Sequence, residues 1–425
     1  MASLHPPPPP RRVAVLGLGY VGSVTAACLA QAGHYVAGVD RDAYKVECIL
    51  SGKAPFYEPG LEETIQSGVA AGRLTAFTDL SEAVANADVA MVCVGTPSDK
   101  SGNISLDQLH RACREIRSTL DARTFPLVVA IRSTAFPGVC EDLYRNPLDA
   151  HPNVRVVSNP EFLREGTAMR DFEEPSLIVV GGDDPAAVDM VAGLYYGMKG
   201  QLRRVALKTA EMIKYGCNAF HAVKISFANE LGSVCQALSI SATEVMDVLC
   251  QDTRLNISPV YLKPGFAFGG SCLPKDMRAL VFRANRLGLD LPMLNNILPS
   301  NMSHLARAQN FALEVPGERI GVFGLAFKEN TDDLRESPVV ALLEFLIGKG
   351  RTLKVHDPNI DLTQIYGANQ KFLLSAIPHI GRLMEENLDI LLEWSDHLII
   401  AQKPSPSHAE RIAASGKPVL NLISL

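Results

Sequence analysis

The sequence predicts an α/β protein with two Rossmann-like, doubly wound domains joined by a central helical region. Short apolar strands alternate with helical stretches near both ends of the chain, and a long proline-free helical stretch lies between these two regions. Alternating strands and helices are typical of a parallel sheet covered by helices. The predicted parts are a disordered proline-rich tail at 1–12, a first Rossmann-like domain at 13–207, a central helical region at 208–306 and a second Rossmann-like domain at 307–425.

The first domain opens with a predicted βαβ unit. Residues 13–16 form a short apolar strand, the small residues after Gly22 form a helix that ends at Gly33, and 34–40 form a second strand. Such a unit takes about thirty residues. Further strands are expected at 89–95, 127–134 and 176–182, and helical stretches separate most of them.

The pattern changes near Lys208. The long stretch 209–238 has helical periodicity and no proline, and 242–252 continues the helical region. Strands and helices then alternate again. Strands are expected at 319–327, 352–358, 397–402 and 418–423, with a helix at 339–350.

Composition narrows the class of protein. The formal net charge is -6, which argues against a nucleic-acid binder, because such proteins usually present strongly basic surfaces. The nine cysteines include no C-x-x-C pair, which fits neither a disulfide framework nor a zinc ribbon, and we expect no metal. The first residues lack the apolar segment of a secretory signal, and no apolar run is long enough for a membrane span. We therefore expect a soluble, cytoplasmic protein.

A glycine-rich turn follows the first strand. Gly17, Gly19 and Gly22 form a G-x-G-x-x-G pattern between a strand and a helix, where a pyrophosphate can approach the backbone and the helix amino terminus. Asp40 ends the second strand about twenty residues later, where a carboxylate binds the adenosine ribose and repels a 2′-phosphate. The pattern predicts NAD rather than NADP, despite Arg41. The alternative is a glycine-rich turn that binds nothing.

Cys272 is a candidate nucleophile. It follows two glycines, and Lys275 and Asp276 come shortly after it. A nearby ammonium lowers the pKa of a thiol and so makes the thiolate available. The alternative is a structural cysteine, because most free cysteines are small buried side chains.

One face of the long central helix carries polar groups. Lys214, Asn218 and His221 are spaced four and three residues apart, so they share a face, and Asn229 falls near the same stripe. These residues are interpreted as a pocket wall. The alternative is a solvated helix face.

The segment Asn159–Gly166 is a candidate loop. Its Asn-Pro pair marks a turn, and Glu161 and Glu165 lie four residues apart. The alternative is a surface turn before a helix.

The segment Gly324–Ser337 follows a predicted strand. It places Lys328 and Arg335 among acidic residues. These cations are candidate phosphate ligands, and a salt-bridged loop is the alternative.

Six motifs occur together in one order: GLGYVG…GVD, CVGTP, NPEFLREG, EMIKYGCNAF, FGGSCLPKD and GLAFKENTDDLRESP. With them the chain resembles the UDP-glucose/GDP-mannose dehydrogenase family over nearly its whole length. The resemblance implies an NAD-dependent oxidation of C6 of a nucleotide-linked hexose to a carboxylate. Several stretches, among them 57–62, 212–230 and 263–276, are more similar to the members that oxidise GDP-mannose, and Lys263 stands where those members have an arginine.

The resemblance also implies roles for individual residues. The implied catalytic set is Cys272, Lys214, Asn218, Glu161, Asp276 and Thr134. The implied cofactor-binding set is Gly17, Gly19, Tyr20, Val21, Gly22, Asp40, Lys45, Thr96, Thr134, Lys275 and Arg335. The implied substrate-binding set is Leu163, Glu165, Lys214, Asn218, His221, Asn229, Tyr261, Lys263, Phe266, Gly269 and Lys328. The second Rossmann-like domain would bind the sugar nucleotide, and at least a homodimer with shared active sites is implied.

Two alternative functions remain at this stage. One is the oxidation of UDP-glucose or another UDP-sugar, which turnover with different nucleotide sugars would distinguish. The other is a non-catalytic protein that binds a dinucleotide or a sugar nucleotide. The complete set of Cys272, Lys214, Asn218, Glu161 and Asp276 argues against the second alternative. If the substrate is GDP-mannose, the resemblance implies a product that feeds the synthesis of alginate-type polysaccharides.

Overall fold

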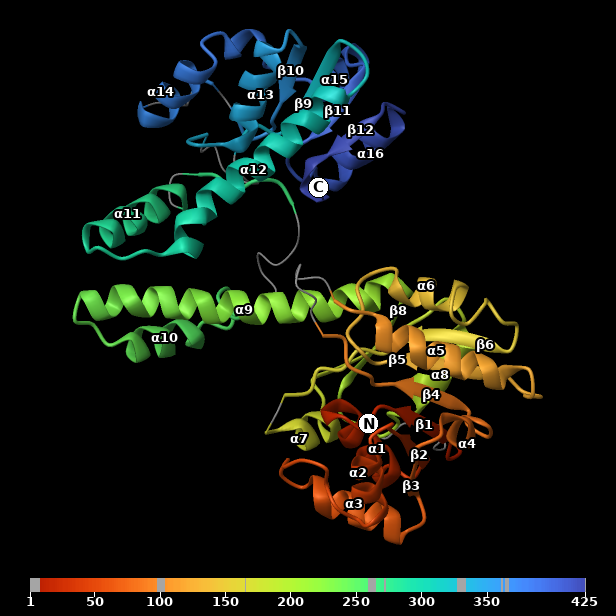
Figure 1. Cartoon of the computed structure of the whole chain (residues 1–425). Helices are drawn as coiled ribbons and strands as arrows, with labels where there is room; N and C mark the ends of the chain where they lie inside the picture. Colours follow the sequence, from red (N-terminus) through yellow and green to blue (C-terminus); the bar gives the residue numbers. More distant parts are fainter. Residues whose placement is uncertain are drawn as a thin grey trace. The chain divides into compact units, whose positions relative to one another are not determined.

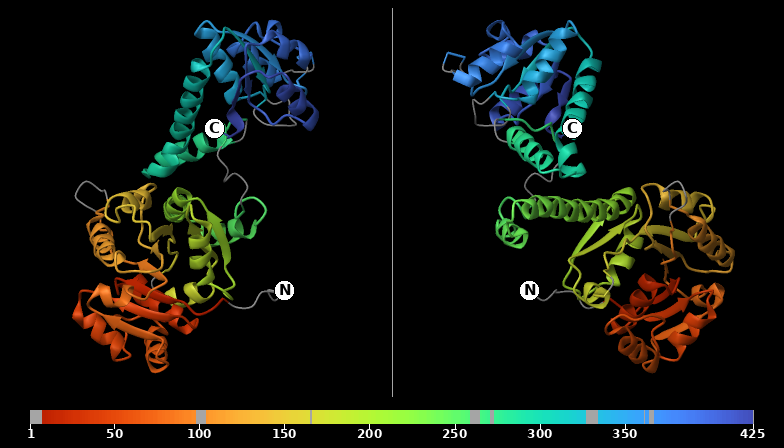
Figure 2. Two further views of the ribbon diagram at one scale, coloured as in Figure 1. Left: turned by 90° about the vertical axis from the view of Figure 1, so that its right-hand side faces the viewer. Right: turned by 60° about the vertical axis from the view of Figure 1, so that its left-hand side comes forward.

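The computed structural model describes residues 8–97, 104–164, 166–258, 265–270, 273–326, 334–360, 362–363 and 367–424. The chain divides into two compact units, Met1–His221 and Ala222–Leu425. The long helix α9 (Leu207–Ala237) contributes residues to both units, and Figure 2 shows it as one extended helix. The α/β architecture with a central helical region is the one that the sequence predicts.

The first unit is built on an eight-stranded sheet with the strand order β3-β2-β1-β4-β5-β6-β7-β8 (Figure 1). The sheet is parallel from β3 to β6, and the strand order reverses between β1 and β4, as in the doubly wound fold. The strands are β1 (Arg12–Leu16), β2 (Tyr35–Val39), β3 (Leu74–Phe77), β4 (Val89–Val92), β5 (Leu127–Ile131), β6 (Val154–Ser158), β7 (Leu177–Gly181) and β8 (Gln201–Val205).

One pairing near an edge of this sheet is antiparallel. Strand β7 pairs antiparallel with β6 through Ser158 and Gly181, and β8 then runs parallel to β7. Among the described residues of the connection from β6 to β7, the helix is the six-residue α7 (Ala168–Glu173). An antiparallel neighbour requires no crossover across the face of the sheet, so this short connection suffices.

Helices cover both faces of this sheet. On one face α1, α3 and α8 bury Val24, Ile65 and Val191, and on the other face α5 and α6 bury Ile116 and Leu143. The two cores hold the carboxyl ends of the strands in fixed positions. The helices are α1 (Tyr20–Gln31), α2 (Ala43–Leu50), α3 (Leu61–Ala70), α4 (Leu80–Val84), α5 (Asp107–Leu120), α6 (Val139–Arg145), α7 and α8 (Pro185–Gly193).

The second unit contains a helical region and a parallel four-stranded sheet with the order β10-β9-β11-β12. Its sheet is formed by β9 (Arg319–Phe323), β10 (Thr352–His356), β11 (His397–Ile400) and β12 (Val419–Asn421). The helices after α9 are α10 (Ala242–Gln251), α11 (Leu273–Arg286), α12 (Pro292–Glu314), α13 (Pro338–Gly348), α14 (Gly367–Ala376), α15 (Leu388–Trp394) and α16 (Pro406–Ala414). Short 3₁₀ turns lie at Ile380–Arg382 and Leu422–Ser424.

Two predicted boundaries differ from the elements of the structure. The predicted break between 306 and 307 falls inside α12, because Ala308 and Ala312 pack into the same core as Ile320 and so continue the helix into the second Rossmann-like fold. At the amino terminus, Arg12 already belongs to β1, while residues 1–7 of the predicted tail lie outside the described residues.

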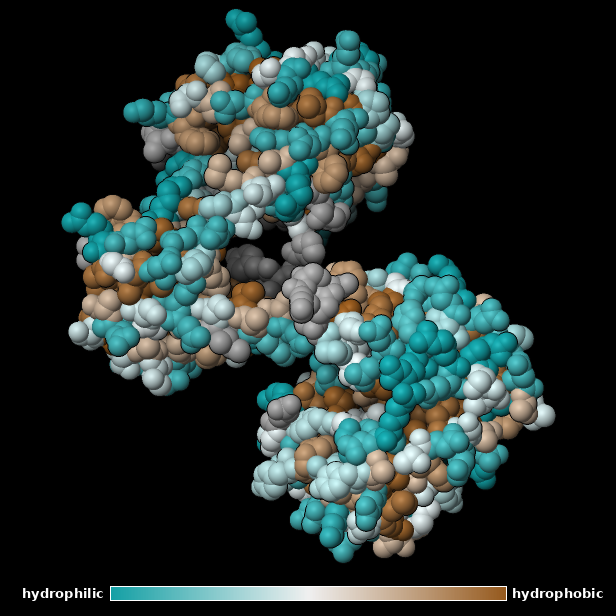
Figure 3. Space-filling model, viewed as in Figure 1, coloured by the Kyte–Doolittle hydropathy of each residue, from teal (hydrophilic) through white to brown (hydrophobic). Residues whose placement is uncertain are grey.

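Apolar side chains are exposed on the hairpin of α9 and α10. Val223 and Val248 are 53% and 63% exposed, and Leu238 and Ile240 between the helices are also exposed. In Figure 3, brown apolar surface is visible among hydrophilic side chains around the far end of α9. Within the described ranges, no helix is both long and apolar enough to cross a membrane.

Candidate functional site

The glycine-rich turn connects β1 to α1 at the carboxyl edge of the first sheet. Gly17 has a φ of +95°, and a Cβ on Gly22 would lie 1.7 Å from the carbonyl oxygen of Gly17. A Cβ on Gly19 would meet no heavy atom within 4 Å, and Gly19 caps α1 without a side chain. Gly17 and Gly22 therefore allow the tight turn, while Gly19 leaves open space before the helix amino terminus, where an anion is stabilised.

Asp40 follows β2 beside this turn. Its Oδ2 accepts hydrogen bonds from the backbone N–H of Leu18 at 2.8 Å and from Nζ of Lys45 at 3.0 Å. Arg41 pairs with Glu115 on α5 and so has a carboxylate partner of its own. The arrangement places a carboxylate where the adenosine ribose of a dinucleotide would bind, which favours NAD over NADP.

Thr96 and Thr134 follow β4 and β5, and both are half-buried. Together with the turn after β1 and Asp40 after β2, they lie at the carboxyl ends of neighbouring strands. In open α/β sheets, ligands bind at this edge where the strand order reverses. The structure therefore places these predicted cofactor residues along one edge.

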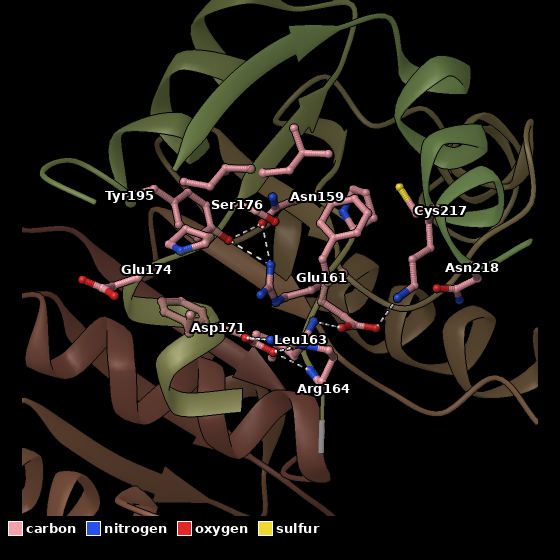
Figure 4. Close-up of a pocket in the computed structure, with 18 of the residues that line it drawn as sticks. Asn159, Glu161, Leu163, Arg164, Asp171, Glu174, Ser176, Tyr195, Cys217 and Asn218 are labelled. Atoms are coloured by element: carbon pink, nitrogen blue, oxygen red, sulfur yellow. Dashed lines mark hydrogen bonds and ion pairs between the residues drawn. The ribbon is translucent and has the colours of Figure 1, made fainter. Parts of the chain in front are cut away.

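A cavity of about 590 Å³ lies in the first unit beside α7 and α9. Side chains from the segment after β6, from α7 and from α9 point into it (Figure 4). Its polar lining includes Arg132, Asn159, Glu161, Arg164, Asp171, Glu174, Lys214, Asn218 and His221. Several charged groups thus line one cavity.

The central feature of this cavity is an ion pair. Nζ of Lys214 lies 2.8 Å from Oε1 of Glu161, and the two side chains are only 9% and 14% exposed. The other carboxylate oxygen of Glu161 accepts the backbone N–H of Leu163 at 2.7 Å. Such a pair offers a fixed carboxylate as a base and an ammonium that stabilises a developing oxyanion.

The predicted polar face of α9 lines the same cavity. Lys214, Asn218 and His221 all contribute to its wall, as their spacing indicates. Asn229, two turns further along α9, is exposed and belongs to the second unit. The structure therefore brings three of these four residues together.

Cys217 also lines the cavity, although the sequence analysis did not single it out. The signal was available, because Cys217 lies three residues after Lys214 and therefore near the same helix face. It is partly exposed. Cys217 is thus a second thiol that any test of Cys272 has to include.

Buried cysteines elsewhere in the first unit are unsuited to nucleophilic attack. Burial raises the pKa of Cys28, Cys93 and Cys113 to about 12, and burial also raises the pKa of Cys140 well above its usual value. A thiol with such a pKa stays protonated near neutral pH, and the thiolate is the reactive form.

A buried polar network lines part of the cavity, and no sequence motif predicts it. Arg132 is 4% exposed and donates to Thr25 Oγ1 at 3.0 Å, to Asn159 Oδ1 at 3.3 Å and to the Tyr195 hydroxyl at 3.0 Å. Tyr195 in turn donates to Asn159 at 2.5 Å. Asn159 begins the segment that carries Glu161, so the network fixes the start of that segment. No spacing pattern in the sequence joins residues this far apart.

Among the predicted site residues of the second unit, Gly269 and Phe266 pack within that unit. A Cβ on Gly269 would lie 2.2 Å from the carbonyl oxygen of Glu336, so only glycine fits there. Phe266 packs against the core of the second sheet. Lys275 on α11 and Arg335 are exposed.

Several predicted residues fall outside the described part of the chain. They are Glu165, Tyr261, Lys263, Cys272 and Lys328. Asp276 belongs to α11, but its side chain is likewise outside the description.

Comparison with known protein families gives three matches along the chain. Residues 11–199 match the NAD binding domain of the UDP-glucose/GDP-mannose dehydrogenase family, residues 208–303 match its central domain and residues 321–403 match its UDP binding domain. The three matches occur in the order of the two sheets and the helical region between them.

Individual relatives cover nearly the whole chain. A GDP-mannose 6-dehydrogenase of Pseudomonas syringae pv. syringae is 42% identical over 97% of this chain and 96% of its own length. A UDP-glucose 6-dehydrogenase of Bacillus subtilis is 34% identical over 90% of this chain and 88% of its own length. Among solved structures, a ternary complex of GDP-mannose dehydrogenase from Pseudomonas aeruginosa has a TM-score of 0.92 at 40% identity, covering 97% of this chain and 96% of that chain.

Proposed function

Since the chain belongs to the UDP-glucose/GDP-mannose dehydrogenase family, we propose that it is an NAD-dependent GDP-mannose 6-dehydrogenase that converts GDP-mannose to GDP-mannuronate. The observation that carries the chemistry is the buried Lys214–Glu161 pair in a cavity of the NAD-binding domain. The choice of sugar nucleotide is supported by 42% identity to a GDP-mannose 6-dehydrogenase, compared with 34% and 37% identity to two UDP-glucose 6-dehydrogenases.

The residues of the first unit fit NAD. The open space at Gly19, the amino terminus of α1 and the carboxylate of Asp40 suit the pyrophosphate and the adenosine ribose. Tyr20, Val21, Thr96 and Thr134 are proposed to complete this cofactor site, together with Lys275 and Arg335 of the second unit. NAD bound at this site would supply the hydride acceptor for each of the two oxidation steps.

The overall reaction balances as a four-electron oxidation. One primary alcohol, two NAD⁺ and one water give one carboxylate, two NADH and three protons. The aldehyde formed first would be attacked by the thiolate of Cys272, which forms a C–S bond and a thiohemiacetal. Oxidation of the thiohemiacetal gives a thioester, and water then cleaves the C–S bond and releases the acid. Covalent capture keeps the reactive aldehyde in the site.

The proposed roles of the cavity residues follow from their chemistry. The Lys214 ammonium and the Asn218 amide would stabilise the oxyanions of the alcohol and thiohemiacetal stages. Glu161 would accept a proton or orient the hydrolytic water, with Asp276 and Thr134 assisting. Leu163, His221, Phe266 and Gly269 would contact the substrate, together with Glu165, Asn229, Tyr261, Lys263 and Lys328.

We propose a homodimer or a higher homo-oligomer with shared active sites. The exposed apolar residues Val223, Leu238, Ile240 and Val248 on the α9–α10 hairpin support this assembly, because large exposed apolar patches mark interaction surfaces. The enzyme is proposed to act in the cytoplasm, and its product to serve the synthesis of an alginate-type polysaccharide.

The experiment that tests this function is NADH release with a panel of nucleotide sugars. GDP-mannose should be oxidised with the highest kcat/KM, and two NADH should form for each sugar acid. Higher kcat/KM with UDP-glucose would make the protein a UDP-sugar dehydrogenase instead. No turnover with any sugar nucleotide, despite binding, would favour a non-catalytic binding protein.

A further inference from the structure

Glu58 is a buried carboxylate to which the sequence motifs assign no role. It is 5% exposed and lies just before α3. Its side chain accepts a hydrogen bond from the hydroxyl of Tyr20, one from the backbone N–H of Gly166 at 2.8 Å and one from the backbone N–H of Ala168 at 2.8 Å. Three segments far apart in the sequence therefore meet at one carboxylate.

These hydrogen bonds keep Glu58 ionised. Burial by itself raises the pKa of a carboxyl group, but the donors Tyr20, Gly166, Ala168 and Met169 outweigh burial and lower the pKa of Glu58 below its usual value. Replacement of these donors would leave a buried charge unsatisfied. Glu58 thus constrains the position of every donor it binds.

The donors belong to two functional segments. Tyr20 is the first residue of α1 and directly follows the glycine-rich turn. Gly166 ends the segment that begins at Asn159 and carries Glu161 into the cavity, and Ala168 is the first residue of α7. The Gly166 N–H also lies 3.1 Å from the Tyr20 hydroxyl. Tyr20 is further held by Phe56, whose ring centroid lies 5.1 Å away.

We propose that Glu58 and Tyr20 form a positioning device that couples the glycine-rich cofactor turn to the segment carrying Glu161. This inference rests on the proposed function, because it assumes that the turn binds NAD and that the segment contacts the sugar nucleotide. Binding of NAD at the turn restricts the motion of the start of α1. The Tyr20–Glu58 hydrogen bond then restricts the motion of Gly166 and of the segment before it.

A simpler role for Glu58 is to cap the short helix α7 and nothing more. Tyr20 distinguishes the two roles, because its hydroxyl is not part of α7. Under the coupling proposal, Tyr20→Phe impairs the sugar-nucleotide side of the site although the substitution lies at the cofactor turn. Under the capping role alone, Tyr20→Phe leaves the sugar-nucleotide side unchanged.

The test measures KM for GDP-mannose at saturating NAD in Glu58→Gln, Tyr20→Phe and the double variant. Glu58→Gln is nearly isosteric, but its amide N–H₂ cannot accept a hydrogen bond from the donors that Glu58 binds. We expect each single variant to raise this KM about tenfold, as the loss of a hydrogen bond to a charged group does, and the double variant to raise it by much less than the product. Glu63→Gln on α3 and Tyr44→Phe on α2 are matched controls, since both side chains are exposed.

A second measurement does not depend on turnover. Hydrogen exchange of the segment 159–169 is followed with and without NADH. We expect NADH to slow this exchange in the parent and in both controls but not in Glu58→Gln or Tyr20→Phe. If Glu58→Gln does not fold, Tyr20→Phe alone tests the coupling.

Two results would overturn the coupling. One is a KM in both variants within twofold of the controls, and the other is equal protection by NADH in variants and parent. If the parent oxidises no nucleotide sugar, the proposed function fails while the exchange measurement still decides the coupling.

Discussion

Breaking the Lys214–Glu161 pair has a predictable effect on stability. Nζ of Lys214 and Oε1 of Glu161 lie 2.8 Å apart, and the two side chains are 9% and 14% exposed, so the pair resembles a buried ion pair more than an exposed one. Removal of one partner from a buried pair leaves an uncompensated charge and costs about 3–5 kcal/mol, compared with about 0–1 kcal/mol for an exposed pair. We expect Lys214→Met to lower the free energy of unfolding by about 3 kcal/mol.

The double variant Lys214→Met/Glu161→Gln separates stability from catalysis. Because no charge is left unpaired, it should regain most of the stability that Lys214→Met loses. It should not regain activity, because loss of an oxyanion-stabilising group lowers kcat by about 10²–10³-fold and loss of the carboxylate removes the base as well. Urea unfolding and steady-state NADH formation measure the two effects.

Two results would contradict the buried state and the catalytic role of the Lys214–Glu161 ion pair. If Lys214→Met unfolds within about 0.5 kcal/mol of the parent, the ion pair is not effectively buried. If the double variant oxidises GDP-mannose at near-parent rates, neither group takes part in the chemistry. Glu63→Gln, on the exposed face of α3, controls for the loss of a carboxylate.

Two further predictions concern the cofactor and the assembly. Asp40→Ser removes the carboxylate that holds Lys45 and frees this ammonium for a 2′-phosphate, so the ratio of kcat/KM with NADP to that with NAD should rise about tenfold or more. An unchanged ratio would remove Asp40 from the ribose site. Val248→Asp should convert the dimer to monomer in light scattering, because it buries a charge in the proposed interface, whereas the equally exposed Tyr44→Phe should not. A parent that is monomeric would contradict the proposed assembly.

Local patterns predicted much of the fold. The glycine-rich turn, Asp40 and the shared face of Lys214, Asn218 and His221 depend on short spacings that the sequence displays directly. The strands β1, β2, β4 and β5 are predicted because they are mostly buried and therefore read as nearly continuous apolar runs.

The missed elements lacked such a pattern. The edge strands β3 and β8 are short and partly exposed, and β8 reads QLRRV, so neither forms an apolar run. The interior strand β6 was missed as well, because it reads VRVVS and Arg155 interrupts its apolar residues. The predicted strand 89–95 extends beyond Val92, because the apolar residues Cys93 and Val94 continue into the loop. The antiparallel pairing of β7 depends on the short connection through α7 and not on the composition of the strand.

The site residues that the sequence does not predict escape prediction for a different reason. Arg132, Asn159 and Tyr195 meet only when β5, β6 and the turn after α8 pack together, and a single polar residue at the end of a strand carries no spacing signal. In the sequence, Glu58 stands out only as part of the stretch 57–62. Its hydrogen-bond partners Tyr20 and Gly166 lie 38 and 108 residues away along the chain. Such contacts become apparent only in three dimensions.

The most direct test of the proposed mechanism compares two cysteines. Cys272→Ser and Cys217→Ser are assayed for NADH and sugar acid formed from GDP-mannose, with mass analysis of trapped adducts. A serine hydroxyl has a much higher pKa than a thiol and is a poor nucleophile near neutral pH, so acid formation in Cys272→Ser should fall by several orders of magnitude while binding of NAD and GDP-mannose persists. Cys217→Ser should retain near-parent turnover, two NADH per acid and a trapped adduct on Cys272. Near-parent acid formation in Cys272→Ser, or its collapse in Cys217→Ser with the adduct on Cys217, would contradict the covalent role of Cys272.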